Sequence, residues 1–135
     1  MSRFSAFSPT PKQRENLAKL ATYLEALPAD YQHFRVAAYY GEFVSNEDDQ
    51  PYLDIELELS NPLTRKAPNE CGTCACAVGH GPSAGIRVYG DWDWGAYCNR
   101  VFGTTITREA GKYMFGPEWS DDHLAAAARI RAVLA

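Results

Sequence analysis

The segment Thr10-Pro11-Lys12-Gln13 combines several signals for the start of an α-helix, and it is the local feature that most constrains the fold. Thr10 suits the N-cap, and Pro11 suits the first helical position, where its missing N–H costs nothing. Gln13 can complete a capping box with Thr10. Apolar residues then follow at helical spacing until Pro28 ends the run: Leu17, Leu20, Ala21, Leu24 and Leu27. The sequence therefore predicts an amphipathic helix over residues 10–27.

Two segments in the first half of the chain have the character of β-strands. Residues 34–40 are rich in residues with high β-propensity and end at Gly41. In residues 53–59, aliphatic and acidic residues alternate, which is the period-two pattern of a half-buried strand. The polar residues 46–51 between them are typical of a hairpin loop. The pattern therefore predicts an antiparallel pair of strands with its acids facing water.

The second half of the chain is predicted to be helical. A short buried helix is expected at residues 74–78, and a second at 91–102 with Asp91 as its cap and Gly103 after its end. A third is expected at 107–115, capped by Thr107, and a fourth from Ser120 onward. The second should bury Trp94, Tyr97, Cys98, Val101 and Phe102, and the last should bury Leu124, Ala127, Ile130 and Leu134.

These elements indicate an α+β fold that is mostly helical, with about five helices and a small antiparallel sheet or hairpin near residues 34–59. The 135 residues fit a single globular domain, with residues 1–9 as a loose N-terminal arm. No apolar run approaches the ~20 residues that cross a membrane, and the N-terminal residues lack the apolar core of a secretory signal. We therefore expect a cytoplasmic protein that does not interact with membranes.

The most distinctive motif is CGTCACAVGH at residues 71–80, which contains three of the four cysteines. In a reducing compartment these cysteines are expected to be free thiols, metal ligands or redox groups. Cys71, Cys74, Cys76 and His80 are of the types that zinc prefers, although four ligands within ten residues strain a tetrahedral site. If residues 74–78 are helical, Cys74 and Cys76 also point to different sides.

Two other interpretations of this motif compete with zinc. Cys71 and Cys74 partly match the pattern of a papain-like protease, in which a cysteine attacks from a helix N-terminus, and His80 is a further catalytic candidate nearby. Such an enzyme needs a distant histidine as base, and only His123 is available downstream. The third interpretation is packing, because cysteine is commonly buried as a small apolar residue. We favour packing, with His33 and His123 also structural and with no cofactor expected.

Negative charge is concentrated in one region. The chain has no lysine or arginine between Arg35 and Arg65, and this stretch contains seven acids: Glu42, Glu47, Asp48, Asp49, Asp54, Glu56 and Glu58. Such a block disfavours nucleic acid as a partner for the region. It is either a solvated surface or a docking surface for a basic partner.

The chain resembles a family of small uncharacterised proteins from bacteria, phages and plasmids. The shared pattern C-G-T-x-x-C-A-x-G-[HW] is matched by residues 71–80. A closing A-A-x-R-I helix corresponds to Ala127-Ala128-Arg129-Ile130. Cys74 falls at a variable position, so the resemblance does not imply a four-ligand zinc site. It implies a fold and a mobile-element setting, and no activity.

Taken together, these features predict a non-enzymatic accessory protein that binds another protein through its acidic region. If the protein comes from a mobile element, we expect it to modulate a host system. The alternative is a zinc-binding protein or a cysteine-dependent enzyme centred on residues 71–80. Neither the partner nor the oligomeric state follows from the sequence.

Overall fold

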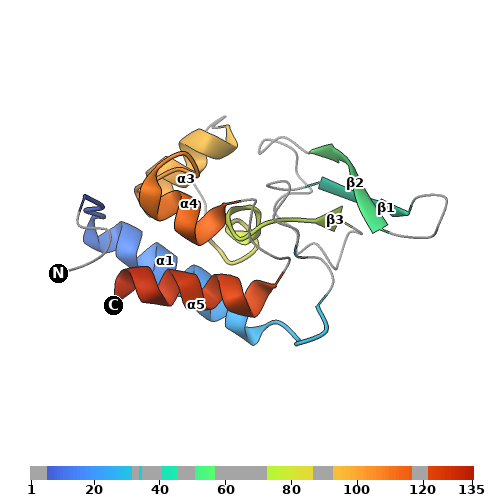
Figure 1. Cartoon of the computed structure of the whole chain (residues 1–135), viewed down its shortest axis with the longest axis horizontal. Helices are drawn as coiled ribbons and strands as arrows, with labels where there is room; N and C mark the ends of the chain where they lie inside the picture. Colours follow the sequence, from blue (N-terminus) through green and yellow to red (C-terminus); the bar gives the residue numbers. More distant parts are fainter. Residues whose placement is uncertain are drawn as a thin grey trace.

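The computed structural model describes residues 6–31, 34, 41–45, 51–56, 73–86, 93–116 and 122–135, with backbone only at 41–45, 51–56 and 73–74. Four α-helices lie in these residues: α1 (Pro11–Ala26), α3 (Trp94–Phe102), α4 (Glu109–Phe115) and α5 (His123–Leu134). Figure 1 shows α1 and α5 side by side, with α3 and α4 beside them. Arg14, near the start of α1, donates to the Leu134 carbonyl at the end of α5 at 2.8 Å, so the two helices run antiparallel.

The predicted start of α1 is confirmed. The Gln13 amide donates to Thr10 Oγ1 at 3.1 Å, and the Thr10 amide donates to Gln13 Oε1 at 2.8 Å, which is the reciprocal capping box. Leu17, Leu20, Ala21 and Leu24 are buried on one face of the helix. The side chain of Asn16 is also buried, and it donates to the Val101 carbonyl of α3 at 2.9 Å. The spacing and capping of this segment were therefore sufficient to specify the helix and its buried face.

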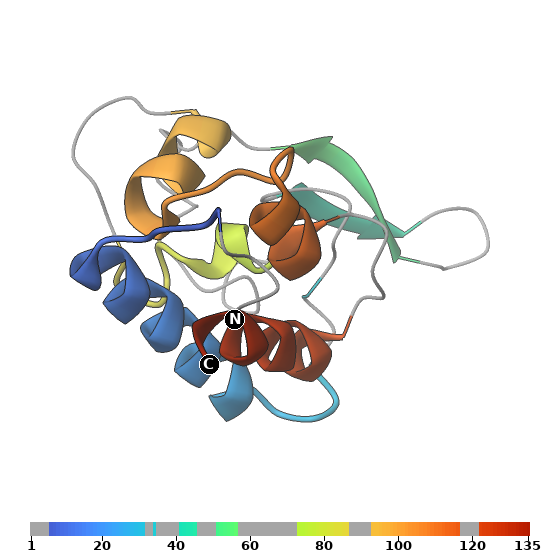
Figure 2. The same ribbon diagram turned by 60° about the vertical axis from the view of Figure 1, so that its left-hand side comes forward.

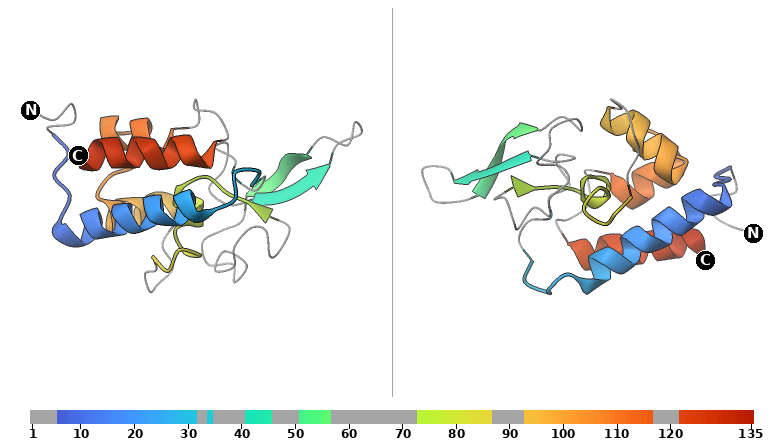
Figure 3. Two further views of the ribbon diagram at one scale, coloured as in Figure 1. Left: turned by 90° about the horizontal axis from the view of Figure 1, so that it is seen from below. Right: turned by 180° about the vertical axis from the view of Figure 1, so that it is seen from behind.

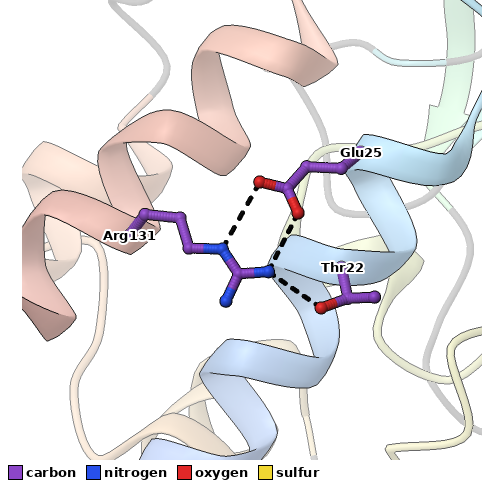
Figure 4. Close-up of polar contacts among 3 residues, drawn as sticks. All are labelled: Thr22, Glu25 and Arg131. Carbon is purple, nitrogen blue, oxygen red and sulfur yellow. Dashed lines mark hydrogen bonds and ion pairs between the residues drawn. The ribbon is translucent and has the colours of Figure 1, made fainter.

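A polar contact on the exposed side ties α1 to α5. Arg131 of α5 donates from Nε and Nη2 to the carboxylate of Glu25, at 3.3 and 2.9 Å, and from Nη2 to Thr22 Oγ1 at 2.8 Å (Figure 4). The hydrogen bond from Arg131 lowers the pKa of Glu25. Because both side chains are exposed to water, this contact orients the helix pair more than it stabilises it.

Helix α3 begins two residues later than predicted, with Asp93 as its N-cap, and Gly103 at φ +82° ends it in the left-handed conformation. All five residues of its predicted buried face are buried. Helix α5 differs more. Ala127 and Ile130 are buried as predicted, but Leu124 is 42% exposed, and the buried face instead includes His123, Ala126 and Val133. Alanine occupies several sides of α5, so the spacing of apolar residues does not show which face of this helix is buried.

The predicted α+β fold class is wrong, because the described part of the chain is a mainly helical protein with four α-helices rather than about five. The buried apolar side chains that the structure describes come from the helices, from Phe34 and from residues 75–86. Three short strands form a ribbon beside the helical body (Figures 1 and 3): β1 (Gly41–Ser45), β2 (Pro51–Glu56) and β3 (Thr73–Cys74). The alternation of aliphatic and acidic residues therefore predicted strand conformation correctly, but it did not show whether the strands form a layer of the core.

The ribbon has the order β2-β1-β3, and both pairings are antiparallel. Phe43 pairs with Leu53 and Ser45 with Pro51, whereas Gly41 lies between Glu56 and Cys74. Residues 35–40 of the first predicted strand lie outside the described part of the chain, and Phe34 forms an isolated parallel bridge with Ala75. The ribbon therefore leads, through β3, directly into the cysteine motif.

Candidate functional site

Residues 75–86 run through the centre of the molecule, between the ribbon and the helices (Figure 2). Ala75, Ala77 and Val78 are buried, as the packing interpretation predicts. The predicted helix at residues 74–78 is wrong: Cys74 ends β3, and a single 3₁₀ turn, η2 (Val78–His80), follows Ala77. Ala75, three residues before η2, forms an isolated parallel bridge with Phe34, and this pairing outweighs the helix propensity of small apolar residues.

His80, the last residue of the motif, is completely buried and uses both ring nitrogens. Nδ1 lies 2.8 Å from the Cys76 carbonyl oxygen, and Nε2 lies 2.8 Å from the Tyr31 hydroxyl. A carbonyl oxygen only accepts, so Nδ1 carries the proton and donates to Cys76. In the neutral ring, Nε2 then accepts from Tyr31. The contact between Cys76 and His80 therefore joins the imidazole to a backbone carbonyl and is not a contact between two metal-ligating side chains.

Aromatic rings surround this imidazole. Phe34 stacks on His80 with ring centroids 5.7 Å apart, and Tyr31 meets His80 edge-on at 5.6 Å. Tyr31 also meets the ring of His123 edge-on at 5.6 Å. We call Tyr31, Phe34, His80 and His123 the histidine cluster. It joins the α1–β1 connection, the cysteine motif and α5.

The sequence indicates a structural role for His123 but does not predict that it lies in the same cluster as His80. It is 3% exposed, and its Nε2 is buried with no hydrogen-bond partner in the described residues. No sequence signal could have identified this position, because His123 lies 43 residues after His80 and in a different element. The third histidine, His33, lies outside the described residues.

The four cysteines fall into two groups. Cys71 lies outside the described residues, and Cys74 is described by its backbone alone. Cys76 and Cys98 are both buried free thiols. Burial, with a further contribution from the charge of nearby Cys76, raises the pKa of Cys98. A thiol with a raised pKa is protonated at neutral pH and is a poor nucleophile.

This shift predicts a loss of stability at alkaline pH. A group whose pKa is raised on folding contributes stability that is complete below its unfolded pKa, here about 8.5, and that is lost as the pH rises further. We expect the contribution to fall by about 1.4 kcal/mol per pH unit above that value. Urea unfolding at neutral and alkaline pH should therefore show a steeper decline for the native chain than for Cys98→Ala. Equal declines in the two proteins would contradict the burial of a neutral thiol.

The candidate metal ligands are not assembled in the part of the chain that the structure describes. Within those residues, no group of three or more histidine, cysteine, aspartate or glutamate side chains is placed to hold a metal ion. The side chains of Cys71 and Cys74 are not among those described, so zinc binding stays a prediction. It can be tested by elemental analysis of protein purified without chelator.

The acidic residues are placed only in part. Glu42 lies in β1 opposite Thr73, and Asp54 and Glu56 lie two residues apart in β2. Glu47, Asp48, Asp49 and Glu58 lie outside the described residues. Because β2 has β1 on one side only, the second backbone edge of this acidic strand is not paired within the described ribbon.

Comparison with known proteins gives no match to a family model, to a curated protein or to a solved structure. The resemblance to a mobile-element family therefore stays a prediction. No helix in the described ranges has both the length and the apolar character needed to span a membrane.

Proposed function

We propose that the protein is a non-enzymatic accessory protein that binds a partner protein through its acidic ribbon. The supporting observation is the position of β2 at an edge of the ribbon, with Asp54 and Glu56 in it. An edge strand offers backbone N–H and C=O groups to which an extended segment can add as a further strand. Together with the negative charge of the region, this favours an extended, basic segment as the ligand.

The surroundings of the cysteine motif are consistent with this assignment. The lone pair of His80 Nε2 accepts a hydrogen bond from Tyr31, so a role as general base would require this bond to break. The raised pKa of Cys98 disfavours a thiolate there. In this proposal the motif holds the ribbon on the helical body, and binding takes place on the ribbon. The resemblance suggests a mobile-element protein that modulates a host system.

A charge-reversal experiment tests the proposal. The probe is a synthetic peptide in which lysine and valine alternate, and the variant is Asp54→Lys/Glu56→Lys. We expect the native chain to bind the peptide with an affinity that falls as salt rises, and the variant to lose this binding. Amide exchange should show new protection in β2 when the peptide is bound.

The matched control is Glu15→Lys/Asp30→Lys, which makes the same change in net charge at exposed positions away from the ribbon. This control should bind nearly as tightly as the native chain. Equal loss in both variants would show that net charge alone attracts the peptide. Unchanged binding after reversal of Asp54 and Glu56 would exclude β2 as the docking strand.

A further inference from the structure

A pocket of about 330 Å³ lies between the N-terminal arm and the connection from α3 to α4. Phe7 from the arm and Ala110 from α4 form apolar parts of its wall, and Thr104, Arg108 and Glu109 supply polar groups. The volume is at the small end of the range for ligand pockets. It suits a small metabolite rather than a nucleotide-sized cofactor.

The two charged residues of the wall are adjacent in sequence and opposite in sign. In the described part of the chain, neither Arg108 nor Glu109 forms a hydrogen bond or ion pair through its side chain. They do not neutralise each other by contact, although both border the same pocket. Both side chains are exposed to water at the rim of the pocket, so a ligand that carries a negative and a positive group can pair with each of them.

A third polar group is buried in the same wall. Thr104 is 1% exposed, and its hydroxyl donates to the Thr105 carbonyl at 3.5 Å, which is the long limit for such a bond. Among the described residues, no donor is directed at this hydroxyl oxygen. The oxygen can therefore accept a hydrogen bond from a ligand.

We propose that this pocket binds a free α-amino acid with an apolar side chain. Arg108 pairs with the carboxylate, because its guanidinium presents parallel donors to a carboxylate. Glu109, with Thr104 as a further acceptor, holds the ammonium group. Phe7 and Ala110 contact the side chain of the ligand. The partly buried position of Phe7 against the core keeps the arm at the mouth of the pocket.

The experiment compares phenylalanine with two analogues that each lack one charge, 3-phenylpropanoate and phenethylamine, by titration calorimetry on the full chain. We expect phenylalanine to bind and each analogue to bind about tenfold more weakly or worse, as loss of one charge-assisted bond implies. Arg108→Gln should weaken binding of phenylalanine but not of phenethylamine. Glu109→Gln should weaken binding of phenylalanine but not of 3-phenylpropanoate.

The control variant is Lys12→Gln, which removes an exposed charge of α1 that does not border the pocket and should leave binding unchanged. Absence of saturable binding of phenylalanine up to about 10 mM would overturn the proposal. Equal binding of all three compounds, or binding unaffected by both pocket variants, would do the same. None of these variants touches β2, so the result is independent of the proposed function.

Discussion

Replacement of Gly111 by alanine is expected to destabilise the protein by about 3 kcal/mol, at the upper end for overpacking of a core. Gly111 is a buried residue of α4, and a Cβ added there would overlap the carbonyl group of Thr105. That group belongs to the backbone and already accepts from the Arg108 amide at 3.1 Å, so it cannot move without opening the turn before α4. Thermal unfolding should show a midpoint lower by about 10 °C.

The matched control is Gly95→Ala in α3. A Cβ at Gly95 would meet nothing nearer than Asp93 Oδ1, at an ordinary contact distance of 3.4 Å. This variant should be neutral or more stable by up to about 1 kcal/mol, because alanine is the better helix former. If Gly111→Ala unfolds at the same temperature as Gly95→Ala, the close approach of α4 to Thr105 is not present in solution.

Replacement of His80 by leucine is expected to cost about 3 kcal/mol. The substitution removes two hydrogen bonds of a fully buried imidazole, one to the Cys76 carbonyl and one with the Tyr31 hydroxyl, at about 1–1.5 kcal/mol each. The Cys76 carbonyl still accepts from the backbone amide of residue 80 at 3.1 Å, and the stack of the ring on Phe34 is lost as well. Partial access of water to Tyr31 lessens its share, since this residue is only partly buried. Urea unfolding followed by tyrosine fluorescence measures the change.

A double-mutant cycle separates the hydrogen bond from general packing at this position. Tyr31→Phe alone should cost about 1–2 kcal/mol, because Nε2 of buried His80 loses its donor. The double variant should then be more stable than the sum of the single changes predicts, by about 1 kcal/mol, because the two residues contact each other. Strict additivity would show that Tyr31 and His80 do not form this bond. Release of zinc on His80→Leu would instead support the metal-binding alternative.

Local signals predicted α1 and α3 well and the fold class badly. The predicted Thr107 cap is wrong, because α4 begins at Glu109 with Arg108 as its N-cap. The capping box at Thr10 and the buried face of α3 are set by residues within one or two helical turns, so spacing alone identifies them. Residues 74–78 of the motif were predicted to be helical from their small apolar side chains. Instead, Cys74 ends β3, and a 3₁₀ turn begins at Val78. The argument that Cys74 and Cys76 point to different sides depended on that helix, so it no longer holds. What governs this segment is pairing with β1 and Phe34, which are distant in sequence.

The N-terminal helix predicted from Thr10-Pro11-Lys12-Gln13 is the clearest case of a structure that the sequence determined by itself. Its cap, its first turn and its apolar stripe all involve residues at most four positions apart, so no distant contact is needed to form them. Only the tertiary structure decided what this helix packs against, and which histidines meet. Tyr31, Phe34, His80 and His123 are brought together by packing of segments from both ends of the chain, and the pocket beside Phe7 depends on the turn after α3. Such contacts depend on how the buried faces fit together, and periodicity carries no information about that fit.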